Sequence, residues 1–548
     1  MWLAMAVAAN LAVSRHADAW QTPPPSPVQS PAGPPRPLVE SVPPFARADL
    51  TALYAGAARA PRDTAAAGDR PMLLHAHNQL GPAEADLAAR AQRAKEAMAA
   101  GQFDEAAAGY AEVVKAMPGD AGMRLNLGMA LSMAGRIQEA VPHLERAVTL
   151  QPALMPAWLF IGASRLQLGE PDRALAPLRK VAAAEPDNTR ARELLGEALM
   201  ALERYEGAVV QFRAVTTGEP SRARGWFGLG KSYEALARAA FARLAHVTGG
   251  SPYALLLQAD VFAASGNLPR AIELYRQVLA DDPTLRTARE ELARAVERAG
   301  EVETASRERE QLRGEPSCET ATAAARRQAA CEFRAGRYAA VPQLLKGSRT
   351  AESSYWLARA YNELARNAFD RLVELPPSPE LHQFRAAMHR DRGQHLDAAE
   401  ELRLALQMVP GDVPLQQELA TALLDAKSYD EAIQLLEPLA RRTSSADTLF
   451  LLGDALLISG RAEEALAPLR ATVSRAPAFL PARRSLGRAY LQTGNPRASI
   501  PHLEAALKID EDGSVHYQLA RAYQATGREE LAKKMLARYA AIVKGLRR

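Results

Sequence analysis

A period of 34 residues begins near Leu87 and governs most of this 548-residue protein. Repeats that start at residues 87, 121, 155, 189 and 223 have a small residue at position eight, and the first four also have alanine at position twenty and proline at position thirty-two. These columns hold Ala94, Gly128, Gly162, Gly196 and Gly230; Ala106, Ala140, Ala174 and Ala208; and Pro118, Pro152, Pro186 and Pro220. Small residues let two antiparallel helices approach closely, and proline, which has no N–H to donate, ends the second helix. The period therefore predicts a stack of helix pairs.

Large apolar residues accompany the small ones. Tyr110, Leu144, Leu178 and Phe212 stand at position twenty-four, where they fill the space beside the small residues. The combination resembles the motif of the tetratricopeptide-repeat family from about Leu87 to Gly545. Its columns recur as Ala259, Ala271 and Pro283; Ala386, Ala398 and Pro410; Ala420 and Ala432; Gly453, Ala465 and Pro477; Gly487, Tyr490 and Leu503; and Ala520, Tyr523 and Ala532. The resemblance implies an all-α fold, a right-handed superhelical solenoid of about fourteen antiparallel helix pairs, with degenerate pairs near residues 286–315 and 318–346.

The fifth repeat departs from this pattern. Its phrase Tyr233-Glu-Ala-Leu-Ala-Arg-Ala-Ala-Phe241 runs through the place where a glycine turn is expected, and Tyr361-Asn-Glu-Leu-Ala-Arg-Asn-Ala-Phe369 repeats the phrase 128 residues later. We therefore expect a larger duplicated unit inside the solenoid, and a change of curvature at the two aberrant repeats.

The N-terminal region differs from the rest. Its first residues form an apolar stretch of signal-peptide length that ends in Ala17-Asp18-Ala19, a small-x-small cleavage pattern, although no Lys or Arg precedes the stretch. Residues 21–44 contain ten prolines, which predict an extended linker. The predicted plan is a signal peptide at 1–19, a proline-rich linker at 20–44, an irregular segment at 45–86, a first array at 87–315 and a second array at 316–548, continuous with the first. We expect an exported, periplasmic protein with no integral membrane segment in its mature form; the alternative is a cytoplasmic regulatory scaffold that keeps its first residues.

Motifs for catalysis are missing from the sequence. It lacks a phosphate-binding Gly-x-x-x-x-Gly-Lys-Ser/Thr, a dinucleotide glycine fingerprint, His-Glu-x-x-His and Cys-x-x-Cys. The histidines at 75 and 77, and those at 382, 389 and 395, have no accompanying cluster of ligands, so we predict no metal and no cofactor. We therefore expect a non-enzymatic scaffold; the alternative is a hydrolase or transferase with a site in the irregular middle repeats.

Two cysteines, Cys318 and Cys331, lie in those middle repeats. Thirteen residues of continuous helix would separate them by about 20 Å, which is beyond the reach of a disulfide. A disulfide therefore requires a break in the helix, and two free thiols are the alternative.

The resemblance also implies where partners bind, because the first helix of each tetratricopeptide repeat lines a concave groove with positions two, five, nine and twelve. Near one end these positions form an apolar stripe, and near the other they include arginines. The residues are Leu125, Met129, Leu159, Ala163 and Leu166 in the stripe, and Phe450, Asp454, Arg484, Arg488, Tyr517 and Arg521 at the other end. The stripe suits an amphipathic or extended apolar segment, and the arginines suit a carboxylate such as the C-terminus of a partner protein.

Each of these two surfaces has an alternative interpretation. The stripe could be covered by the protein's own residues 45–85, and the arginines could pair with Asp454 and Glu504 on neighbouring helices. We expect partner proteins or peptides in the groove. The net charge of +4, from 67 basic and 63 acidic residues, gives no support to nucleic-acid binding.

Overall fold

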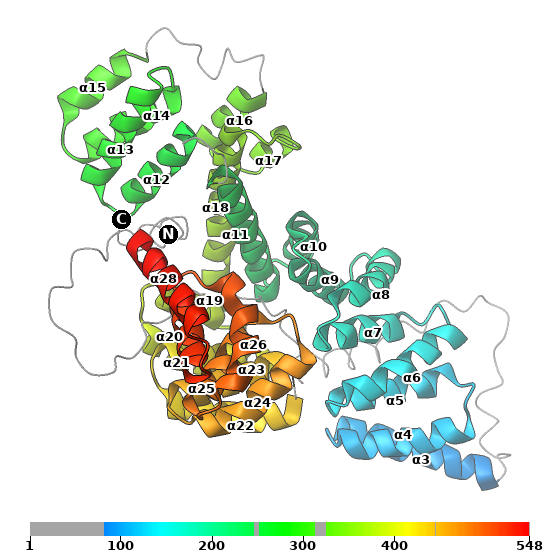
Figure 1. Cartoon of the computed structure of the whole chain (residues 1–548). Helices are drawn as coiled ribbons and strands as arrows, with labels where there is room; N and C mark the ends of the chain where they lie inside the picture. Colours follow the sequence, from blue (N-terminus) through cyan, green and yellow to red (C-terminus); the bar gives the residue numbers. More distant parts are fainter. Residues whose placement is uncertain (1–81, 246–250, 313–324, 444, 547–548) are drawn as a thin grey trace, which may run out of the picture.

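The computed structural model describes residues 82–245, 251–312, 325–443 and 445–546, and the regular structure in these ranges is helical (Figure 1). The all-α repeat fold predicted from the period is confirmed. The signal peptide expected at 1–19, the linker expected at 20–44 and all but the end of the segment expected at 45–86 lie outside the described residues.

Within the part of the protein that the structure describes, most helices pair with their neighbour in the sequence, and only α11 (Ala223–Ala245) and α18 (Ala351–Val373) do not. The pairs before α11 are α3 (Pro82–Ala99) and α4 (Phe103–Ala116), α5 (Ala121–Met133) and α6 (Ile137–Leu150), α7 (Met155–Gln167) and α8 (Pro171–Ala184), and α9 (Thr189–Ala201) and α10 (Tyr205–Gly218). Between α11 and α18 lie α12 (Pro252–Ala264) and α13 (Leu268–Asp281), α14 (Arg286–Arg298) and α15 (Val302–Glu310), and α16 (Ala325–Arg334) and α17 (Ala340–Leu344). After α18 come α19 (Pro379–Asp391) and α20 (His395–Met408), α21 (Val413–Asp425) and α22 (Tyr429–Thr443), α23 (Ala446–Ile458) and α24 (Ala462–Arg475), α25 (Leu480–Gln492) and α26 (Pro496–Ala506), and α27 (Ser514–Ala525) and α28 (Glu529–Leu546), with the short 3₁₀ helix η2 (Leu507–Ile509) before α27.

The periodic residues act as the sequence predicts. Second helices end two residues before the periodic prolines, as α4 does at Ala116 before Pro118, because the residue that precedes a proline is driven out of the helical region. A Cβ added at Gly128 would lie 2.5 Å from Leu144 Cγ. A side chain at position eight would therefore collide with the large residue at position twenty-four, which is why glycine occupies the position here and in the next two repeats, at Gly162 and Gly196.

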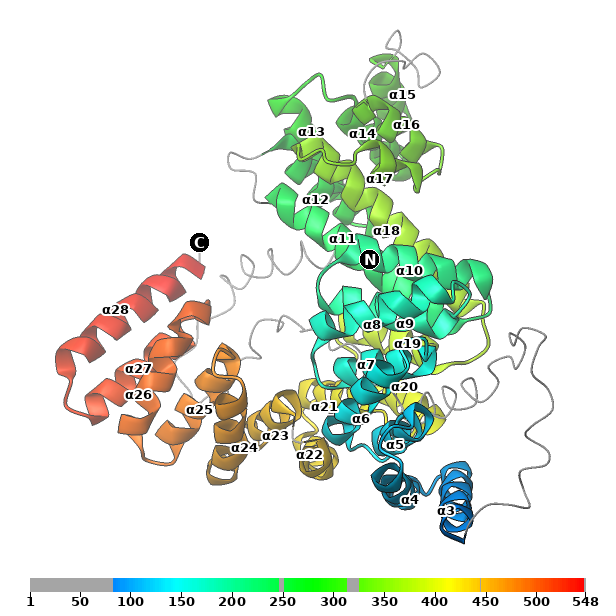
Figure 2. The same cartoon turned by 90° about the vertical axis from the view of Figure 1, so that its right-hand side faces the viewer.

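The two long helices pack against each other in antiparallel orientation, although their sequences are 128 residues apart (Figures 1 and 2). The Tyr233 and Tyr361 rings stack with their centroids 6.2 Å apart, and the Phe227 and Phe369 rings meet edge to face at 6.5 Å. A Cβ on Gly230 would lie 2.6 Å from the Phe369 ring. Phe369 thus occupies the space that the large residue at position twenty-four fills in a regular repeat. The turn that is missing from the fifth repeat is not needed, because α18, and not the next helix in the sequence, pairs with α11.

Two stacks of helices cross at this pair. In the main stack, α10 packs on α11, and α11 packs on α19, where Arg224 Nε lies 3.2 Å from Glu380 Oε1 and the Phe369 ring stacks on Phe384 at 4.5 Å. The main stack therefore consists of α3–α10, the first half of α11, the second half of α18 and α19–α28. The remaining halves of α11 and α18 form a side stack with α12–α17.

The crossing corrects the expectation that the second array simply continues the first. After α10 and the start of α11, the next helices in space are the end of α18 and then α19, while α12–α17 project away as the side stack (Figure 2). The physical reason is the length of α11, since a helix of 23 residues carries the backbone past the point where a turn would have returned it to the main stack.

We expect Gly230→Ala to destabilise the protein by about 1–3 kcal/mol, because the added methyl group overpacks the contact with Phe369. The matched control is Gly218→Ala, at the end of α10, where an added Cβ meets nothing within 4 Å. This control should be neutral or slightly stabilising. Urea unfolding of both variants measures the difference, and equal stabilities would contradict the packing of α18 on α11.

Candidate functional site

The first helices of successive pairs form the inner face of the main stack. They contact one another along the stack, as α5 does with α7 and α23 with α25, whereas successive second helices barely touch. A stack whose first helices lie closer together than its second helices curves towards the first helices. These contacts place the inner face on the concave side of the stack.

The apolar stripe expected near the N-terminal end is not an open groove. Leu125, Met129, Leu159 and Leu166 are only 8%, 2%, 7% and 6% exposed. Because the first helices touch, large residues at these positions pack against the neighbouring first helix and belong to the hydrophobic core. The expectation of an exposed stripe is corrected.

The next inner-face position, Glu193 on α9, is a buried charge that sequence reasoning missed. Its carboxylate lies 2.7 Å from Arg222 Nε and 3.0 Å from Arg190 Nη1, and none of its surface is exposed. Burial alone would raise the pKa of Glu193, but the hydrogen bond from Arg222 and the charges of Arg190 and Arg224 lower it below its usual value. The signal in the sequence was a glutamate at position five, where the two preceding repeats have leucine.

The three arginines predicted for the groove lie on two adjacent first helices. Arg484 and Arg488 are one turn apart on α25 and half-buried, and Arg521 on α27 is exposed. Within the described ranges none of the three makes an ion pair or a hydrogen bond with another residue, although the charge of Arg484 acts on Asp512 at longer range.

The carboxylates considered as partners of these arginines are engaged elsewhere. Asp454 accepts a hydrogen bond from the Ser485 hydroxyl, and Glu504 accepts one from the Tyr523 hydroxyl. The alternative interpretation, in which Asp454 and Glu504 neutralise the arginines, therefore does not describe this structure.

Two aromatic residues predicted for the groove lie on the same set of first helices. Phe450 on α23 is 5% exposed and packs edge-on against Phe479. It therefore belongs to the core beneath the inner face, whereas the sequence predicted that it would line the groove. Tyr517 on α27 is 45% exposed and lies against Tyr539. Arginines one turn apart, with a third on the next helix and an aromatic ring beside them, make a surface that can bind carboxylates.

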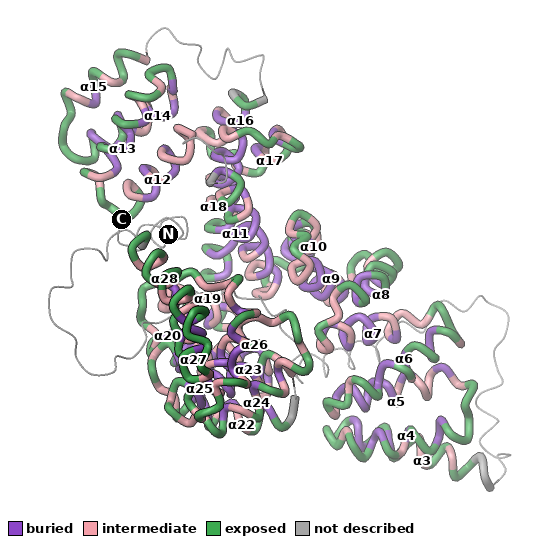
Figure 3. The backbone as a smooth tube through the Cα atoms, viewed as in Figure 1, coloured by how far each residue is buried: buried purple, intermediate pink, exposed green. Residues whose placement is uncertain are grey.

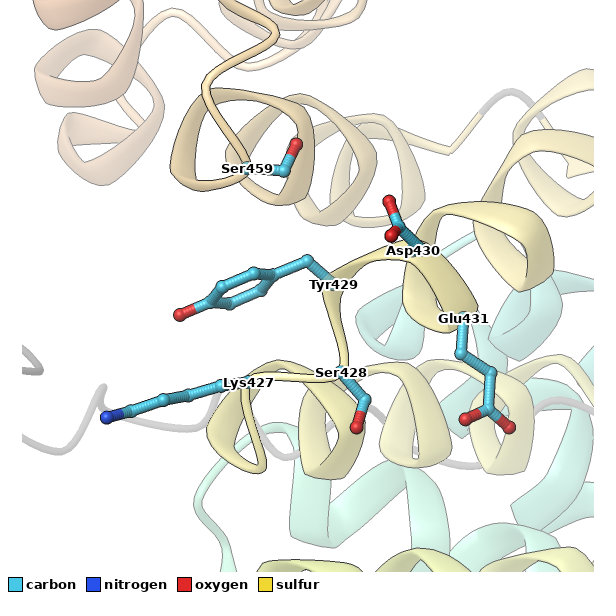
Figure 4. Close-up of a pocket in the computed structure, with 6 residues that line it drawn as sticks. All are labelled: Lys427, Ser428, Tyr429, Asp430, Glu431 and Ser459. Carbon is cyan, nitrogen blue, oxygen red and sulfur yellow. The ribbon is translucent and has the colours of Figure 1, made fainter.

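A shallow pocket of about 420 Å³ opens at the edge of the same stack (Figure 4). It is lined by Lys427, Ser428, Tyr429, Asp430 and Glu431 from the turn between α21 and α22, and by Ser459 at the end of α23. Figure 4 shows the Lys427 and Tyr429 side chains extending to the same side of the turn. The pocket mixes one positive and two negative side chains, and we assign no ligand to it.

The remaining residues singled out in the sequence are placed as follows. His382 is buried and its Nδ1 lies 2.6 Å from Glu401 Oε2, while His389 contacts Gln394. The described residues contain no group of three or more His, Cys, Asp or Glu side chains arranged to hold a metal ion.

Cys331 lies on α16, but Cys318 is outside the described residues, so the disulfide remains a prediction. No helix in the described part of the protein is both long and apolar enough to cross a bilayer.

A repeated helix pair with a curved inner face defines a class of repeat proteins, and comparison with known proteins identifies the family. Tetratricopeptide-repeat models match residues 91–154, 165–227, 235–286, 256–308, 350–478 and 484–543. The chain belongs to the tetratricopeptide-repeat family.

Solved structures similar to part of this protein include two MamA proteins. MamA 41-end from Desulfovibrio magneticus RS-1 is 20% identical, with a TM-score of 0.29, over 30% of this protein and 96% of that one. MamA AMB-1 is 26% identical, with a TM-score of 0.27, over 28% of this protein and 84% of that one. The comparison with curated proteins finds no match.

The inner-face charges should differ in their effect on stability. Glu193→Ala removes the buried carboxylate that Arg190 and the partly exposed Arg222 share, and should destabilise the protein by about 1–3 kcal/mol. Arg484→Glu, Arg488→Glu and Arg521→Glu break no described ion pair or hydrogen bond, so each should change the stability by no more than about 0.5 kcal/mol. Urea unfolding tests both statements, and a loss for the arginine variants as large as that for Glu193→Ala would make the arginines structural.

Proposed function

We propose that this protein is a non-enzymatic interaction scaffold that binds a carboxylate-bearing segment of a partner protein on the inner face of α23, α25 and α27. The observation that carries the proposal is the set of three arginines, Arg484, Arg488 and Arg521, that form no ion pair among the described residues. A cation held near a concave surface without a paired carboxylate is available to a ligand carboxylate, and guanidinium groups bind carboxylates through paired hydrogen bonds.

The family supports the same interpretation, because tetratricopeptide repeats bind other proteins. The tyrosine beside the arginines, Tyr517, offers an exposed apolar ring for a side chain of the bound segment. We further propose that the protein is exported and works in the periplasm, on the basis of the apolar N-terminal stretch and its small-x-small end. N-terminal sequencing of the protein isolated from its native cell tests the export, which predicts a mature form that begins at Trp20.

The binding surface is tested by reversing its charge. The triple variant Arg484→Glu, Arg488→Glu and Arg521→Glu should lose capture of at least one protein in a quantitative pulldown from the native cell, because repulsion replaces attraction for the partner's carboxylates. The matched control reverses Arg146, Arg179 and Arg497, which are exposed on second helices and make no described ion pair. Capture by the control should equal that by the unmodified protein. Capture that is unchanged in the groove variant would discard the arginine site.

A further inference from the structure

The inner face of the side stack is closed by a buried charge cluster centred on Asp260 of α12. The Asp260 carboxylate accepts hydrogen bonds from the hydroxyl of Tyr275 on α13, at 2.8 Å, and from that of Tyr355 on α18, at 2.7 Å. Arg359 on α18 places Nη1 3.4 Å from the same carboxylate. Only 13% of the Asp260 side chain is exposed, so these three groups replace most of its hydration.

Arg359 links this carboxylate to a second one. Its Nη1 also lies 2.9 Å from Glu291 Oε1 on α14, and the guanidinium sits over the Phe333 ring of α16 with 4.6 Å to the centroid. One side chain on α18 therefore contacts α12, α14 and α16 at once. Through Arg359, the side stack is held to the long helix that also belongs to the main stack.

Further charges surround the cluster without contacting Asp260. Glu290 on α14 lies 2.7 Å from Arg286 Nε and 2.6 Å from Arg334 Nη2 on α16, and Glu291 also pairs with Arg294 at 3.0 Å. Each of these acids has at least one arginine partner. Asp260, in contrast, shares its arginine, Arg359, with Glu291.

The protonation of Asp260 is therefore sensitive to pH near neutrality. The pKa of Asp260 is raised to about 6: burial raises it most, the charge of Glu291 raises it further, and the charge of Arg359 and the two tyrosine hydroxyls oppose the rise. Burial also raises the pKa of Tyr275 and of Tyr355, so both hydroxyls keep their protons and remain donors.

We propose that Asp260, Glu291 and Arg359 form an acid-responsive latch, which holds α12 and α14 against α18 more tightly as the pH falls from neutral to mildly acidic values. When the side stack opens locally, Asp260 enters water and its pKa returns to the ordinary value near 4. Asp260 then has the higher pKa in the closed form and binds a proton more strongly there. Lowering the pH therefore shifts the equilibrium towards the closed form.

The size of the effect follows from linkage. At pH 7.5 Asp260 is ionised in both the closed and the open form, so the proton does not favour either. At pH 5.0 Asp260 is largely protonated in the closed form and largely ionised in the open form. Because pH 5.0 is one unit below the closed-form pKa of about 6, the equilibrium between the two forms shifts about tenfold towards the closed form.

Hydrogen exchange of the full-length protein measures this shift. With rates corrected for intrinsic exchange, protection of α12 and α14 amides should rise about tenfold from pH 7.5 to pH 5.0. Asp260→Asn, which cannot ionise, should abolish this rise. The matched control is Asp391→Asn on α19, whose pKa is also raised by burial to about 6 but which lies in the main stack, and it should leave the rise in α12 and α14 intact.

A second variant keeps the test decisive if Asp260→Asn disrupts the side stack. Tyr275→Phe removes one hydrogen bond to the ionised carboxylate, raises the pKa of Asp260 further, and should move the midpoint of the protection change to higher pH. A rise that persists in Asp260→Asn, an unmodified protein without any rise, or a midpoint that does not move in Tyr275→Phe would each overturn the latch.

Discussion

The contact of Phe369 with Gly230 is the interaction on which the rest of the architecture depends. A regular repeat places its own large residue against the glycine of its first helix, sixteen positions later in the sequence, as Leu144 does with Gly128. In α11 the glycine instead meets a ring from α18. Because a glycine without a partner would leave a void in the core, the long helix α11 requires a second helix, and the duplicated phrase in α18 supplies one.

This shared pair divides the molecule into two stacks whose inner faces have different contents. The side stack fills its inner face with Asp260, Glu291, Arg359 and the tyrosines that hydrogen-bond them. The main stack fills its N-terminal inner face with leucines and buried ion pairs, whereas the arginines near its C-terminal end form no described ion pair. Partner binding is therefore proposed for one end of one stack, and α11 and α18, which carry buried residues along their whole length, connect that stack to the other (Figure 3).

Local features of the fold were predictable from the sequence, whereas the crossing was not. The glycine, alanine and proline columns report contacts within one repeat, so they placed the helix pairs and their ends correctly. The phrase repeated after Tyr233 and Tyr361 indicated two aberrant repeats, but periodicity carries no information about contacts between residues 128 apart. For the same reason the positions of Leu125 and Met129 were assigned to the correct face, while their burial by the neighbouring first helix was missed.

The most direct test of the crossing is to cut the backbone between Leu312 and Cys318, so that both cysteines stay in one fragment and no disulfide can join the two parts, and to ask whether the parts stay together. A protease site inserted there separates α3–α15 from α16–α28, and size-exclusion chromatography with light scattering reports the mass of the product. If α11 and α18 complete each other's helix pairs, the cleaved fragments should elute as one particle with the mass of the whole protein. Separation into two particles, each with the mass of one fragment, would contradict the crossing.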